Sequence, residues 1–341
     1  MSDGSIASQL ELLGLDEMRR RADSEPSPMS RARMLQKIEQ THEILTALPE
    51  PTDLNFLHSG LCQTHLPHSR LEKNSSVWRR RSGAFTLMVT PGVVDRSTLP
   101  GPAKKGDIAP DSDQECYVGV PYGTKARLIM IHLQTEGVKG RTVSLGPSLS
   151  AFLRSLRLPV SGGPRGSIQS VKEQCLRIAR CTFTLQWTGI GVNGSHTVIT
   201  DSKIVDGLEM WNSSREDWSG VVELGERFYE HLREHAVPLD KRAIAMLAGN
   251  SLGLDLYALF VYRLPRLTDP VHLSWAMLKE QIGTEYAATN SLGRKVREVM
   301  PSVKDAYPHA NIELTRHGIL MKNSKPAVPK TTVQGFTIVE G

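Results

Sequence analysis

The sequence predicts an α+β protein in which one order of helices and strands occurs twice. Apolar side chains recur at the three- and four-residue spacing of a buried helix face in residues 126–133, 149–156 and 168–178. Strand-forming stretches accompany these helices at residues 141–145, 182–187 and 197–205. The same order of helix, strand, helix, helix and hairpin returns over residues 252–322, without a visible repeat of the sequence itself.

This order is typical of a winged helix-turn-helix, so we predict two tandem modules of that fold behind an N-terminal helical or extended extension. In such a module the third helix enters a DNA major groove and the hairpin contacts the flanking backbone. The third helix of the first module covers residues 165–180. The polar side chains predicted to face DNA from this helix are Arg165, Ser167, Gln169, Lys172, Arg177 and Arg180.

The second module begins with residues 252–264, a helix that is apolar on nearly every side and is therefore expected to be central and buried. A strand at 271–273 follows, and Ser274 is placed to cap the next helix. The third helix covers residues 291–306, and Pro301 inside it is expected to kink or split it.

The two sides of this third helix differ in chemistry. The apolar stripe consists of Leu292, Val296, Val299 and Val303. The cations predicted to face DNA are Arg294, Lys295, Arg297 and Lys304 on the helix, with Arg316 in the turn of the hairpin over residues 311–322.

Composition shifts predict the domain boundaries. We expect an N-terminal extension over 1–55 that is partly flexible, a strand and loop segment over 56–115 packing on the first domain, modules at 116–206 and 207–323, and a flexible tail over 324–341. Pro26 and Pro28 indicate a linker within the extension. The amphipathic helix over 34–48 either binds a partner or docks on its own domain.

Charge and cysteine content exclude little by themselves. The net charge of +5 favours an anionic partner, although a solvated basic surface explains it equally well. The four cysteines are scattered and contain no Cys-x-x-Cys pair. Neither a secretory signal nor a run of about eighteen apolar residues is present, so we expect a cytoplasmic protein without membrane contact.

Two short motifs leave alternatives open. Arg79, Arg80 and Arg81 follow Trp78, and this run either grips a phosphate chain or forms a solvated turn. Cys62, His65 and His68 are ligand types that suit zinc, but no fourth ligand is evident. We therefore expect no metal and no cofactor.

The sequence matches none of the catalytic motifs considered below. It contains no Gly-rich loop ending in Lys-Ser/Thr and no Gly-x-Ser-x-Gly elbow. The spacing of His65 and His68 does not match the His-hydrophobe-His pair of a nicking initiator. Binding to DNA is the better account, because Arg and Lys suit guanine and Gln suits adenine in the major groove. The alternative is that these helix faces are only solvated.

Several segments together resemble one known family. The segment over 118–128, VGVPYGTKARL, and the segment over 145–153, LGPSLSAFL, are similar to the plasmid-encoded RepA replication initiators. So are residues 62–67, 237–240, 254–258, the Ser274-Trp275 pair and the Tyr307-Pro308 pair. These matches fall in order along most of the chain.

The resemblance implies a protein that binds directly repeated sites in double-stranded origin DNA, helps to open the duplex, and recruits the host replicative helicase and initiator. It also implies repression of its own gene, copy number control and a monomer–dimer balance. Two other functions remain open from the residues alone, a winged-helix transcriptional regulator without an initiator role and a nicking enzyme.

Overall fold

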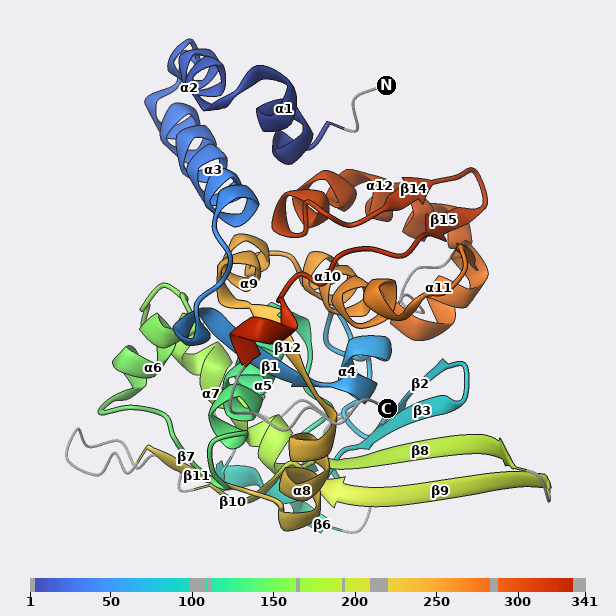
Figure 1. Cartoon of the computed structure of the whole chain (residues 1–341). Coiled ribbons are helices and arrows are strands. Elements are labelled where there is room, and N and C mark those ends of the chain that lie inside the picture. Colours follow the sequence, from blue (N-terminus) through green and yellow to red (C-terminus); the bar gives the residue numbers. More distant parts are fainter. Residues whose placement is uncertain are drawn as a thin grey trace. The chain divides into compact units, whose positions relative to one another are not determined.

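The computed structural model describes residues 4–98, 108–109, 112–163, 166–191, 194–208, 220–282 and 288–333 (Figure 1). Helices alternate with small antiparallel sheets along these residues, so the predicted α+β class is confirmed. The described helices include none that is long and apolar enough to cross a membrane.

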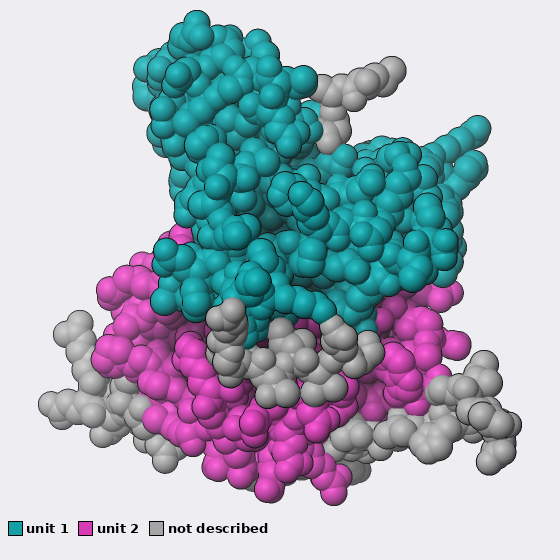
Figure 2. All heavy atoms as spheres, viewed as in Figure 1, with its two compact units in different colours: residues 1–55, 238–279, 286–336 teal, residues 56–237, 280–285, 337–341 magenta. Residues whose placement is uncertain are grey.

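The chain divides into two compact units, each built from segments that are distant in sequence (Figure 2). Unit 1 contains residues 1–55, 238–279 and 286–336, and unit 2 contains residues 56–237, 280–285 and 337–341. The chain passes between them within β1 (Leu54–His58), β12 (Ala236–Asp240) and α11 (Trp275–Ile282).

The strands described in unit 2 form three sheets, in the orders β2-β3-β8-β9, β10-β11-β7 and β4-β6-β5. The first contains β2 (Trp78–Ser82), β3 (Phe85–Thr90), β8 (Thr182–Gly191) and β9 (Gly194–Lys203). The second contains β7 (Thr142–Ser144), β10 (Val205–Leu208) and β11 (Val221–Leu224). The third contains β4 (Val93–Asp95), β5 (Ile108–Ala109) and β6 (Ser112–Tyr117).

The four-stranded sheet has one face in the core. Leu87 pairs with Leu185, and Val89 pairs with Phe183, so all four side chains lie on the same face, and all four are buried. Residues 78–82 belong to this sheet as β2, which rules out the solvated turn, one of the two alternatives left open for this run.

The helices of unit 2 are α4 (Ser59–Gln63), α5 (Gly123–Gly137), α6 (Leu149–Ser155), α7 (Ser167–Arg180) and α8 (Glu226–His235). The helices predicted from periodicity over 126–133, 149–156 and 168–178 are thus confirmed as α5, α6 and α7. Ser148 caps α6, because its hydroxyl accepts a hydrogen bond from the backbone N–H of Ala151.

Unit 1 combines a helical core with one small sheet. Its helices are α1 (Ile6–Leu13), α2 (Leu15–Asp23), α3 (Pro28–Thr46), α9 (Lys241–Leu247), α10 (Ser251–Arg263), most of α11, and α12 (Thr289–Ala306). The sheet has the order β13-β15-β14, with β13 (Val271–Ser274), β14 (Ile312–Leu314) and β15 (Gly318–Met321). The apolar helix α10 is buried along most of its length, as predicted.

The N-terminal extension is folded over its described part. Leu10, Met18, Ala22 and Ile38 from α1, α2 and α3 form a small apolar core. Pro28 occupies the start of α3, where its missing N–H costs nothing, so residues 24–30 make a helix–helix turn and not a linker. The backbone N–H of Ala7 donates to Asp305 Oδ1 on α12 at 2.9 Å. The helix over 34–48 therefore belongs to a segment that docks on its own unit.

The boundary predicted at residues 206/207 differs from the observed division. Residues 221–224 form β11, which pairs with both β10 and β7, so this stretch completes a sheet of unit 2. Pro301 does not split α12, which continues through it as one helix.

Candidate nucleic-acid interface

The strongest candidate surface lies on α12 in unit 1. Leu292, Val296, Val299 and Val303 are all buried, as the periodicity predicted. The opposite side is exposed and carries Arg294, Lys295, Arg297 and Glu298. Because the apolar stripe fixes the rotation of the helix, these charged side chains are turned to solvent by the core packing itself.

The turn after β14 places a further cation beside this helix. Arg316 is exposed in the turn, and the carbonyl oxygen of the preceding Thr315 accepts a 2.6 Å hydrogen bond from Arg297 Nη2. We call the exposed cations Arg294, Lys295 and Arg316 the α12 basic face. Lys304, the other cation predicted on this helix, is half-buried.

One carboxylate interrupts the α12 basic face. Glu298 Oε2 lies 2.6 Å from Lys295 Nζ, and both side chains are about half exposed. The lysine holds the pKa of Glu298 below its usual value through a hydrogen bond, opposed by slight desolvation. An exposed ion pair of this kind contributes little to stability.

The predicted DNA-facing side of α7 is less open. Gln169 and Lys172 are half-buried, and Arg180 is exposed with its Nη2 donating to the carbonyl oxygen of Val93 at 2.6 Å. Leu176 lies between these residues on the same side of the helix and is buried. The exposed part of α7 is therefore two separate patches and not one continuous stripe.

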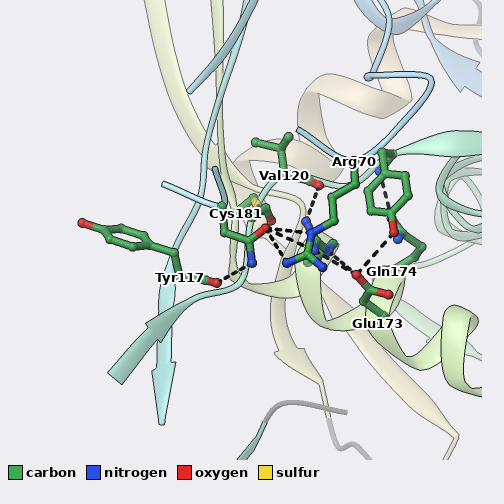
Figure 3. Close-up of polar contacts among 10 residues, drawn as sticks. Arg70, Tyr117, Val120, Glu173, Gln174 and Cys181 are labelled. Atoms are coloured by element: carbon green, nitrogen blue, oxygen red, sulfur yellow. Dashed lines mark hydrogen bonds and ion pairs between the residues drawn. The ribbon is translucent and has the colours of Figure 1, made fainter. Parts of the chain in front are cut away.

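The prediction that Arg177 faces DNA is wrong, because only 3% of this residue is exposed. Its guanidinium donates to Val120 O at 2.9 Å and to Glu173 Oε1 at 2.8 Å (Figure 3). Asn74 bridges the same region, accepting from Arg177 and donating to Tyr117 O. Burial lowers the pKa of Arg177, and the charge of Glu173 opposes that shift.

The network around Arg177 holds the loop before α5 against α7. The backbone N–H of Tyr122 donates to Gln174 Oε1 at 2.8 Å, and the Tyr122 hydroxyl lies 3.5 Å from Glu173 Oε1. Gly119 has φ of +75°, and a Cβ there would lie 2.2 Å from Arg177 Nη1. This part of the VGVPYG segment is therefore shaped for a buried arginine, and Arg177 is not available to DNA.

Ser167, another residue predicted to face DNA from α7, also lacks an open position. Ser167 is buried, and its hydroxyl is hydrogen-bonded to Pro159 O and to Ser161 at the start of the helix. It therefore stabilises the helix start and does not face outward. Arg165 lies outside the described residues.

The three arginines of β2 alternate across the sheet. Arg79 and Arg81 are exposed, whereas Arg80 is 6% exposed with its guanidinium carbon 3.1 Å from the centre of the Trp78 ring. The period of two in a strand explains this difference. Arg80 is thus a packing residue, while Arg79 and Arg81 remain candidates for phosphate contact.

The zinc-type residues do not form a visible centre. Among the described residues, no group of three or more His, Cys, Asp or Glu side chains is arranged to hold a metal ion. Cys62 and His65 are both buried, and the carbonyl of His65 accepts a hydrogen bond from Trp78 Nε1 at 2.7 Å.

The two predicted modules differ in their sheets. In unit 1, β13 precedes α11 and α12 and pairs with β15, so strand and hairpin share one sheet. In unit 2, β7 pairs with β11, and the β8–β9 hairpin instead extends the sheet of β2 and β3. The hairpin beside α12 therefore follows the predicted plan more closely than the hairpin after α7.

Sequence reasoning missed the role of Trp275. Its indole Nε1 donates to the carbonyl oxygen of Arg316 at 3.0 Å, and the Arg297 guanidinium lies 5.0 Å from its ring centre. Trp275 is buried at the start of α11. No local pattern indicates a partner 41 residues further along the chain.

Comparison with known proteins gives a family match for the central part of this chain. Residues 120–276 match the sequence model of the family described as "Plasmid encoded RepA protein". This segment contains most of the VGVPYG stretch, the LGPSLSAFL stretch and Trp275, which carried the predicted resemblance. Residues 120–276 are thus similar to the plasmid-encoded RepA family, which confirms the predicted resemblance.

Two solved structures are similar over part of their length. "Crystal structure of SeMet derivatives of domain2 and domain 3 of RctB" has 14% identity and a TM-score of 0.42, over 70% of this chain and 85% of that one. "Crystal structure of the RctB domains 2-3, RctB-155-483" has 12% identity and a TM-score of 0.39, over 70% and 82%. A search of the curated proteins returned no match.

Proposed function

We propose that this chain is a plasmid replication initiator that binds repeated sites in double-stranded origin DNA. The family match of residues 120–276 supports a role in plasmid replication. The observation that carries the proposal is the α12 basic face, in which Arg294, Lys295 and Arg316 are exposed on a helix and turn that share one unit.

In this proposal, residues 251–322 act as a winged helix-turn-helix with α12 as the helix that enters the major groove. The N-terminal half of α12 carries Arg294 and Lys295, and such side chains bind guanine O6 and N7 or a phosphate. The turn carrying Arg316 contacts the flanking backbone. Glu298 leaves Lys295 when phosphate replaces it.

Residues 116–206 act as a second DNA-contacting module with a smaller surface. Gln169, Lys172 and Arg180 remain as contacts from α7, and Arg79 and Arg81 add charge from β2. Arg177 and Arg80 are left out, because both are engaged inside unit 2.

The remaining roles follow from the family alone. They are opening of the duplex, recruitment of the host replicative helicase and initiator, repression of its own gene, and a monomer–dimer balance. Each of these roles is independent of the DNA-binding site. The absence of any one of them would not contradict binding to the origin through the α12 basic face.

The experiment is protection of origin DNA from nuclease by the full chain, with permanganate used to detect unpaired thymines. We expect protection of direct repeats and permanganate-reactive bases beside them on supercoiled DNA. Protection of a single promoter palindrome without base opening would instead indicate a transcriptional regulator.

A second assay separates binding from catalysis. The full chain is incubated with supercoiled origin DNA and Mg²⁺ or Mn²⁺, and the DNA is examined for nicks and for a tyrosine-linked adduct. We expect neither product. A covalent adduct would overturn the assignment of the chain as a binding protein.

A further inference from the structure

The turn between β14 and β15 is held by hydrogen bonds to three consecutive carbonyl groups. Thr315 O accepts from Arg297 Nη2 at 2.6 Å. Arg316 O accepts from Trp275 Nε1 at 3.0 Å, and His317 O accepts from the backbone N–H of Trp275 at 3.0 Å. The backbone that carries the Arg316 side chain is therefore tied to two residues that lie outside the hairpin.

Arg297 and Trp275 also hold each other. The Arg297 guanidinium carbon lies 5.0 Å from the Trp275 ring centre, a cation–π contact. Arg297 Nη1 donates to the carbonyl oxygen of Gly293 at 3.1 Å, one turn earlier on α12. Both terminal nitrogens of this exposed arginine therefore already donate to backbone carbonyls.

Gly293 makes this close packing feasible. A Cβ at this position would lie 3.2 Å from the Trp275 ring and 3.2 Å from Arg297 Nη1, closer than side chains ordinarily approach. The glycine thus lets the indole, the guanidinium and α12 pack together at the base of the turn.

We infer that Arg297 and Trp275 are positioning residues, which fix the Arg316 turn relative to Arg294 and Lys295 and do not themselves contact DNA. This inference rests on the proposed function of the α12 basic face. A turn that is already ordered loses less conformational freedom when it binds a phosphate, so its cation contributes more to affinity.

The test is a double-mutant cycle on DNA binding by the full chain, measured over a range of salt concentrations. Arg297→Met removes the hydrogen bonds and charge but keeps an aliphatic side chain. It is combined with Arg316→Ala, and the matched control cycle combines Lys295→Ala with Arg316→Ala. The probe is a duplex that carries the protected origin repeat.

The logarithm of the binding constant falls linearly with the logarithm of the salt concentration, and the size of this slope reports the number of phosphate contacts. We expect R297M and R316A each to reduce this log–log salt slope by the equivalent of about one phosphate contact. The double variant should reduce it by about one contact as well. The double variant should bind within about twofold of R297M alone, because the Arg316 contact is already lost there. The control cycle with K295A should be additive. Additive losses in the R297M cycle, with the slope lowered by about two, would show that Arg297 contacts DNA and overturn the inference.

If R297M is poorly folded, Arg297→Lys and a measurement without DNA test the same inference. Lysine keeps the charge but cannot donate to Gly293 O and Thr315 O together from a planar fork, so R297K should bind as weakly as R297M. Full affinity in R297K would contradict a positioning role.

The Trp275 indole N–H resonance, followed without DNA, should shift and exchange faster in both Arg297 variants. An unchanged indole resonance would overturn the inference on its own. A different result would separate this inference from the proposed function. If R294A, K295A and R316A all keep the wild-type salt slope while the indole resonance shifts in the Arg297 variants, the proposed DNA surface is wrong, but the contact between Arg297 and Trp275 is supported.

Discussion

Arg177 Nη2 lies 2.8 Å from Glu173 Oε1, one turn earlier on α7, and the arginine side chain is almost completely buried. The sequence places Arg177 on a basic side of this helix, whereas the structure uses it to bind the loop that precedes α5. Its charge therefore contributes to the stability of unit 2 and not to a surface for DNA.

The first prediction concerns this ion pair. Glu173→Gln should lower the free energy of unfolding by about 3 kcal/mol, because it leaves a buried guanidinium without a counterion. Arg177→Met should lower it by a similar amount, since the buried Val120 O loses the hydrogen bond from Arg177, whereas Asn74 Oδ1 keeps only its donors on Arg70. Urea unfolding followed by circular dichroism measures both effects.

A matched control for this pair lies on α12. Glu298→Gln removes an exposed partner of Lys295 and should leave the free energy of unfolding nearly unchanged. Loss of DNA affinity in R177M at full thermal stability would contradict the structural role of Arg177.

The second prediction concerns pH and a histidine cluster in unit 2. His58 Nδ1 accepts from the backbone N–H of Gly60 at 3.0 Å, so its Nε2 carries the proton and donates to His231 Nδ1 at 2.7 Å. Burial, together with the charges of His231 and His235, lowers the pKa of His58 well below its usual value. The pKa of His231 is lowered by burial and by His235, and Glu234 opposes that shift.

The sign of the pH dependence follows from these shifts. Below about pH 6.5 the unfolded chain binds protons that the folded cluster does not, so the free energy of unfolding should fall with acidification and stay level above that pH. His58→Gln should reduce this dependence, and His309→Gln, at an exposed position, should keep it. Equal pH profiles for wild type and H58Q would contradict this account.

The third prediction concerns Gly318 at the start of β15. A Cβ on this residue would lie 2.2 Å from the carbonyl oxygen of Leu273 on the paired strand β13, which is backbone and cannot rotate away. Gly318→Ala should therefore destabilise the protein by about 1–3 kcal/mol through overpacking.

Gly249 provides the comparison for this substitution. It has no atom within 4 Å of an added Cβ, so Gly249→Ala should be neutral or stabilising by up to about 1 kcal/mol. Thermal unfolding of both variants measures the difference. An unchanged melting temperature for G318A would show that β13 and β15 are further apart than described.

Periodicity alone predicted which side of α12 is buried. Leu292 and Val303 stand eleven residues apart on one stripe, and the structure buries both completely. The same reasoning located α7, but it could not predict the fate of Arg177, because its partners Val120 and Asn74 are 57 and 103 residues away in sequence. A positive charge on a helix does not reveal whether a distant loop covers it.

Local composition misled the interpretation of two segments. Pro26 and Pro28 suggested a linker, yet Pro28 begins α3, where proline is well tolerated. Three successive arginines left a phosphate grip and a solvated turn open, and neither alternative included the strand in which Arg80 packs on Trp78. Local composition does not reveal that residues 78–82 pair with β3, and this pairing makes them a strand.

The most direct test of the central claim is the salt dependence of binding to the origin repeat for the variant R294A/K295A/R316A. The account predicts a log–log slope lower by about three contacts and much weaker binding at physiological salt. Arg20→Ala, an exposed arginine on α2 of the same unit, should keep the wild-type slope. A wild-type slope in the triple variant, with the fold intact, would contradict the claim that the α12 basic face binds DNA.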